Sequence, residues 1–214
     1  MVTLSNRETM PIWRYNVLMD KTPRRSSRAS RALRYLQLEF SAFSAVAVGG
    51  YLETAKTRIW LVNKIGICYL GEIPNTRLIY WLGVPLCIII FGLVTWSLWP
   101  HRGWKGRLAR LLAVVLVLEV GVLGTPFFLT GYLHLVHNAI ATTMFAVEFL
   151  IATWLTFRGK FDNLTGLLWF TQSAASILAG VTFIDLAWDM YLGQALTQLA
   201  FAALLIRSLS RKNR

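Results

Sequence analysis

The sequence predicts an all-α, polytopic membrane protein: a helical bundle with six transmembrane helices and both termini in the cytoplasm. Three observations support this fold class. The chain of 214 residues is 56% hydrophobic, with a mean hydropathy of +0.52, which is more apolar than a typical soluble domain. Its apolar runs have the length of membrane spans. Its basic residues collect in alternate connections between those runs, as they do on the cytoplasmic side of membrane proteins.

A membrane span needs about 20 mostly apolar residues, and five runs meet this condition. A sixth run, Leu36–Leu52, is shorter and contains Glu39. Together the six runs define a transmembrane domain over residues 36–206, in a plasma or inner membrane. The five clear runs are Leu78–Trp99, Leu108–Leu129, Gly131–Phe157, Leu164–Trp188 and Met190–Ile206.

The distribution of Lys and Arg favours the sixth span. With six spans, one side of the membrane receives both tails and the connections 100–107 and 158–163. These segments and their flanks hold all but four of the 22 Lys and Arg residues. The other side receives residues 53–77, which hold those four, and two short connections that hold none. Five spans would move the N-terminal tail across and nearly remove the bias, so we predict six, with the basic side cytoplasmic.

The longest predicted external loop covers residues 53–77. Its centre, Ile59–Pro74, mixes apolar residues with Lys64 and Glu72. This segment is too short to span a membrane. We expect it to lie at the interface or to cover the bundle from outside.

Residues 1–35 and 207–214 are predicted to be basic cytoplasmic tails, and the first of them to be disordered. A net charge of +12 would suggest nucleic-acid binding in a soluble protein. Here the basic residues flank membrane spans, so we expect no nucleic-acid partner. We expect the N-terminal tail to bind anionic lipid or an acidic partner through its charge. The arginines expected to make this contact are Arg24, Arg25, Arg28, Arg31 and Arg34.

The stretch Thr130–Phe149 is apolar enough to lie in a membrane, yet it contains His134, His137 and Glu148. An advance of about 100° per residue places all three on one face of a helix. We expect this face to point into the bundle. Because a helix rises about 1.5 Å per residue, Glu148 lies roughly 16 Å from His137 along the axis, so the three groups do not share one site.

His134 and His137 have the spacing of two metal ligands on one helix, and Asp185 or Asp189 could supply a third. The competing interpretation is structural. In it the imidazoles bond to helix ends and interfacial water, and the two aspartates cap or solvate a helix end. No cofactor is expected, although bound lipid suits the composition.

Three further carboxylates fall inside the predicted spans. Glu39 and Glu148 lie toward the cytoplasmic side, where we expect them to pair with arginines. Glu119 stands alone near the middle of the third span, where an unpaired charge costs a few kcal/mol. Two interpretations stay open for the three residues: a proton relay, or buried polar ties. Candidate partners for Glu119 are Thr171, Gln172, Gln194 and Gln198.

The segment GTPFFLTGYLHLVHNAIATTMFA, residues 124–146, resembles part of the six-span Frag1/DRAM and DUF998-type membrane proteins. In those proteins a short external loop leads into a helix that opens with a His, followed by small residues and a Phe. The matching positions in this sequence are His137, Ala141 and Phe145. The resemblance implies a six-span bundle and carries over no functional residue.

The leading functional expectation is a non-enzymatic accessory, assembly or scaffolding subunit of a membrane complex. Its partners would be lipids and other membrane-protein subunits. One alternative is a proton- or ion-coupled transporter that uses Glu119, Glu148 and His137. Another is a metal-dependent membrane hydrolase with an external site at His134, His137 and Asp185. A haem-binding subunit with His134 or His137 as axial ligand is a further alternative.

Overall fold

A computed structural model describes residues 23–57, 66–125, 132–159, 161–180 and 189–211. Within these ranges every regular element is helical, which confirms the predicted all-α class. The elements are α2 (Pro23–Thr57), the 3-10 helix η2 (Ile67–Gly71), α3 (Arg77–Leu98), α4 (Trp104–Gly124), α5 (Tyr132–Arg158), α6 (Asn163–Gly180) and α7 (Asp189–Ser210).

Helix α2 begins at Pro23, inside the segment predicted to be a disordered tail. Proline suits the first turn of a helix, because the N–H that it lacks would have no partner within the helix there. The Arg, Ala and Leu residues that follow are good helix formers. Ala32 and Leu36 are fully buried, so the early part of α2 packs against the bundle. The prediction of disorder is therefore wrong from Pro23 onward.

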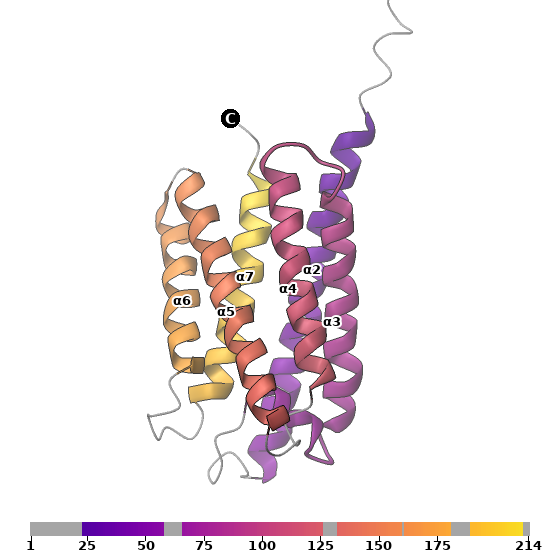
Figure 1. The fold of residues 1–214 in the computed structure, drawn as a ribbon, viewed down its shortest axis with the longest axis vertical. Coiled ribbons are helices and arrows are strands. Elements are labelled where there is room, and N and C mark those ends of the chain that lie inside the picture. Colours follow the sequence, from indigo (N-terminus) through magenta and orange to yellow (C-terminus); the bar gives the residue numbers. More distant parts are fainter. Residues whose placement is uncertain (1–22, 58–65, 126–131, 160, 181–188, 212–214) are drawn as a thin grey trace, which may run out of the picture.

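The long helices alternate in direction, so that α2 begins and α7 ends at the same end of the bundle (Figure 1). The connection 99–103, the end of α5 and the start of α6 also lie at that end, while η2 lies at the opposite one (Figure 1). We call the first the basic end. Basic residues at this end include Arg28, Arg31, Arg34, Arg102, Lys105, Arg107, Arg110, Arg158, Arg207 and Arg211.

The helices form a ring with one helix outside it. Each of α2, α3, α4 and α5 contacts the next, and α7 contacts both α2 and α5, which closes the ring. Helix α6 packs against α5 and α7. Its approach to α7 depends on Gly193, where a Cβ atom would lie 2.6 Å from the backbone nitrogen of Ala179.

Two apolar clusters fill the ring. The larger one reaches toward the basic end and includes Leu36, Leu112 and Phe201. The smaller one lies at the opposite end, where Leu70 of η2 packs with Ala47 and other residues. The described part of the predicted external loop therefore closes the end of the bundle.

Among the described residues, three helical segments are long and apolar enough to cross a membrane: Arg77–Leu98, Tyr132–Arg158 and Met190–Ser210. The others are shorter or more polar. Helix α2 starts with a series of arginines, α4 starts with Lys105 and Arg107, and α6 is 18 residues long with several polar side chains. The exposed face of α3 is a continuous apolar stripe, formed by Leu78, Leu82, Leu86, Ile89, Leu93 and Trp96.

Candidate functional site

Three carboxylates from three helices of the ring meet inside the bundle. Glu39 of α2 is 8% exposed and Glu148 of α5 is fully buried. Glu119 of α4 is near enough to both to interact with them electrostatically. We call these three residues the carboxylate layer. In α2 and α4, Glu39 and Glu119 lie between residues of the two apolar clusters.

Glu148 bonds to a neutral side chain. The amide of Gln198 in α7 donates to both of its carboxylate oxygens, at 2.9 Å and 3.1 Å. The predicted arginine partner of Glu148 is therefore replaced by a glutamine. Gln198 was expected as a possible partner of Glu119, but it bonds to Glu148.

The other two carboxylates each have an unsatisfied oxygen. Oε2 of Glu39 and Oε2 of Glu119 are buried and have no hydrogen-bond partner among the described residues. A buried polar atom without a partner is unfavourable, and an unpaired buried charge is far more so. Glu119, predicted to stand alone near the middle of the third span, has Glu39 of α2 and Glu148 of α5 within electrostatic range.

A small cavity of about 100 Å³ adjoins the unsatisfied carboxylates. Glu39 and Glu119 both line it, together with Gln198. Its described lining contains no Lys, Arg or His. Its other titratable groups are Cys68, Tyr80 and Cys87, which are ordinarily neutral at pH 7. The volume is large enough for water or a small charged group.

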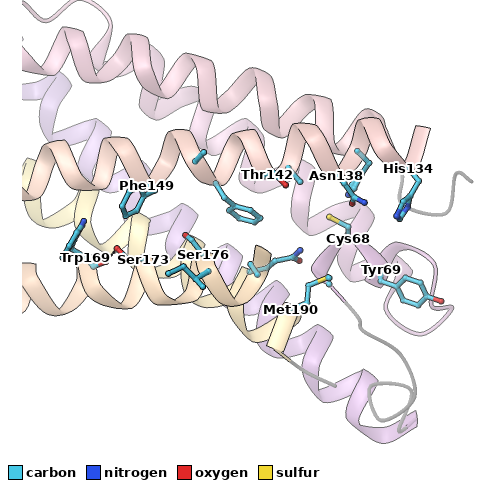
Figure 2. Close-up of a pocket in the computed structure, with 18 residues that line it drawn as sticks. Cys68, Tyr69, His134, Asn138, Thr142, Phe149, Trp169, Ser173, Ser176 and Met190 are labelled. Atoms are coloured by element: carbon cyan, nitrogen blue, oxygen red, sulfur yellow. Dashed lines mark hydrogen bonds between the residues drawn. The ribbon is translucent and has the colours of Figure 1, made fainter. Parts of the chain in front are cut away.

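A second cavity, of about 810 Å³, lies between α5, α6, α7 and η2. We call it the large cavity. A volume of roughly 300–1,000 Å³ is usual for sites that bind small molecules. Figure 2 shows its walls: His134, Asn138 and Thr142 along α5, Ser173 and Ser176 on α6, Cys68 and Tyr69 at one end, and Phe149 and Trp169 at the other.

The two cavities share a wall. Cys68, Ala141, Phe145 and Gln194 line both of them. Gln194 is fixed by η2, because the backbone N–H of Ile67 donates to its side-chain oxygen at 2.6 Å. A ligand in the large cavity is thus one layer of side chains away from the small cavity that holds the unsatisfied carboxylates.

The two histidines also line the large cavity. His137 is 3% exposed, and its Nδ1 donates to the carbonyl oxygen of Thr125. Among the described residues no group of three or more His, Cys, Asp and Glu side chains is arranged to hold a metal ion. Asp185 and the side chain of Asp189, the other predicted ligands, lie outside the described residues.

The arginines predicted to contact lipid lie on α2. Arg28, Arg31 and Arg34 have exposed side chains at the basic end. Arg24 and Arg25 lie in the first turn of the same helix, and their side chains are outside the description. Arg28, Arg31 and Arg34 are spaced three residues apart, so they lie on one side of the helix.

An ion-pair cluster that the sequence analysis did not identify holds α6 and α7 together at the basic end. Asp162 accepts hydrogen bonds from the backbone N–H of Thr165 at 2.8 Å, from Arg207 at 2.7 Å and from Arg211. The hydroxyl of Thr165 accepts from both arginines. The Thr165 N–H and then Arg207 hold the pKa of Asp162 well below its usual range. The signal was present in the sequence, because Asp162 directly before an apolar run is a good helix N-cap.

Comparison of the chain with protein-family models, with curated proteins and with solved structures finds no match. The resemblance of residues 124–146 to six-span proteins stays a prediction.

Proposed function

We propose that this chain is an integral membrane protein with six spanning helices that works as a proton-coupled carrier. The carboxylate layer binds and releases protons, and the large cavity holds the small molecule whose movement depends on them. The observation that supports this most is the pair of buried, unpartnered oxygens of Glu39 and Glu119 on one small cavity, whose described lining contains no cation.

The chemistry of the layer favours proton binding. Three carboxylates within electrostatic range repel one another when ionised, and the low dielectric of a bundle interior strengthens the repulsion. A proton on one of them relieves it. Ionisable groups placed inside a membrane commonly belong to proton or ion pathways. An accessory subunit, the leading expectation from the sequence, needs only a stable bundle and gives no reason for these groups.

The proposed orientation rests on charge. Nearly all described basic residues lie at the basic end, which would face the cytoplasm. In a chain carrying Cys68→Ala and Cys87→Ala, single cysteines test this at two exposed loop positions. We expect Asn75→Cys to react with an impermeant maleimide added to intact cells and Arg102→Cys, in the connection at the basic end, to stay unlabelled. The opposite pattern would contradict the orientation.

Infrared difference spectroscopy of the purified protein tests the proton function directly. Stepwise changes of pH should reveal the carbonyl band of a protonated carboxyl group, which disappears as pH rises. Glu39→Gln and Glu119→Gln should each remove part of the band. Glu53→Gln is the matched control, because Glu53 lies on α2 like Glu39 but pairs with Lys56 at 2.5 Å. If the wild-type protein shows no such band at any pH at which it stays folded, the proposal is contradicted.

A further inference from the structure

We propose that the molecule bound in the large cavity is an amphipathic organic cation, whose apolar body occupies that cavity while its positive group faces the unpartnered carboxylates of Glu39 and Glu119. This inference rests on the proposed proton-coupled function and names its ligand class.

The first argument is the unbalanced charge of the carboxylate layer. Glu39 is more than nine-tenths buried and has an unpartnered oxygen, and it lines the small cavity together with Glu119. Glu148 adds a third carboxyl group, bonded only to the neutral Gln198 among its described neighbours. The remaining titratable groups on the small cavity, two thiols and the Tyr80 phenol, contribute no positive charge. A cation is the ligand that such a site attracts.

The second argument separates an organic cation from a metal ion. The described His, Cys, Asp and Glu side chains do not come together in a set that could hold a metal. A metal ion needs several oxygens at short, defined distances. An ammonium group that carries carbon substituents has no such requirement, because it is attracted by nearby carboxylates and by aromatic faces without fixed coordination.

The third argument concerns the apolar body of the ligand. The large cavity has Phe145, Phe149 and Trp169 in its walls, with Thr142 and Ser173 among the polar groups. Apolar walls with a few placed polar groups are typical of small-molecule sites. Phe145 also lines the small cavity, so its side chain lies where the apolar body would meet the positive group. Figure 2 shows the large cavity running along α5 and α6, which suits an elongated or bulky body.

Proton coupling follows from this placement. A positive group beside the carboxylate layer favours the ionised form of the acids, so its binding should release protons. The converse also holds: protonation should weaken cation binding by the same factor, because linkage is reciprocal.

The test compares two ions of the same shape and opposite charge, tetraphenylphosphonium and tetraphenylborate. Titration calorimetry on the purified full chain, in buffers of different ionisation enthalpy, measures affinity and proton release together. We expect the cation to bind at least about tenfold more tightly than the anion, with proton release, because one unit charge near a partly buried carboxylate is worth that much or more. Glu119→Gln should weaken cation binding about tenfold or more, while Glu53→Gln should leave it unchanged.

A second variant tests the large cavity without touching a carboxylate. Ala146 lines that cavity at an exposed position of α5, so Ala146→Phe should fold and should block the apolar body. It should reduce cation binding while leaving the protonated-carboxyl band intact. Equal binding of the two ions, or a band without any cation binding, would overturn the inference and leave the proton function standing. Cation binding to a protein that never shows the band would support the ligand class and overturn the proton function.

Discussion

The carboxylate of Asp162 and the three carboxylates of the carboxylate layer have opposite surroundings. Asp162, at the basic end, has a side chain that is 41% exposed and bonds to a backbone N–H and to two arginines. In the carboxylate layer Glu39 and Glu148 are buried and Glu119 is half-buried. One neutral amide bonds to Glu148, and Glu39 and Glu119 each have a buried oxygen without a partner among the described residues. The first arrangement stabilises a helix junction. The second places uncompensated acids beside a cavity, which stability alone does not explain and which a proton or a cationic ligand does.

The largest expected effect comes from giving the carboxylate layer the cation that Asp162 already has. Gln198→Lys places an ammonium group beside Glu148 and should keep the layer ionised. We expect tetraphenylphosphonium binding to fall by about a hundredfold and the protonated-carboxyl band to shrink. Gln198→Met, similar in length but neutral, is the control. If the Gln198→Lys variant binds tetraphenylphosphonium as tightly as wild type does, cation binding does not depend on the lack of a positively charged side chain in the layer.

Removing the amide should produce the next largest effect, now on stability. Gln198→Leu leaves the fully buried carboxyl of Glu148 without its described donor. An unsatisfied buried polar group costs about 1–3 kcal/mol, and thermal unfolding in detergent should show a matching drop in melting temperature. Gln37→Leu makes the same change at an exposed position of α2 and should shift stability by only about 0.5 kcal/mol or less. Equal losses for both variants would show that the Gln198–Glu148 bond is unimportant.

Asp162 and the carboxylate layer also differ in how far each could be predicted from the sequence. The length of apolar runs, a local property, predicted five of the long helices, and the distribution of Lys and Arg over the connections added α2. The Asp162 cap was equally local, since it needs only an acid before a helix and an N–H three residues later, and it could have been found. The carboxylate layer could not have been found from the sequence. Glu39, Glu119 and Glu148 belong to different helices, and only the packing of the ring brings them within electrostatic range and places Glu39 and Glu119 on one cavity.

Charge removal at the basic end should have a smaller effect. Asp162→Asn keeps the N-cap, because Asn caps about as well as Asp, but it loses the ion pairs to Arg207 and Arg211. The folded pKa of Asp162 is lowered, so its ion pairs stabilise the protein above the ordinary value of about 3.9 and lose that effect as pH falls below it. The melting temperature of wild type should exceed that of the variant at pH 7, and the gap should close in acid. A gap that is independent of pH would contradict this account.

The smallest effect is expected at Glu53, which forms one ion pair with an exposed lysine of its own helix. Its partner Lys56 is three residues away on α2, at 2.5 Å, and the two side chains are 31% and 67% exposed. Exposed pairs of this spacing contribute about 0.2–0.5 kcal/mol, since water and salt weaken the attraction and both long side chains lose freedom. Glu53→Gln should therefore change the free energy of unfolding by no more than that amount, and 1 M salt should abolish the difference. A loss as large as that of Gln198→Leu would mean that burial does not distinguish Glu148 from Glu53, and the contrast between the carboxylate layer and the bundle ends would fail with it.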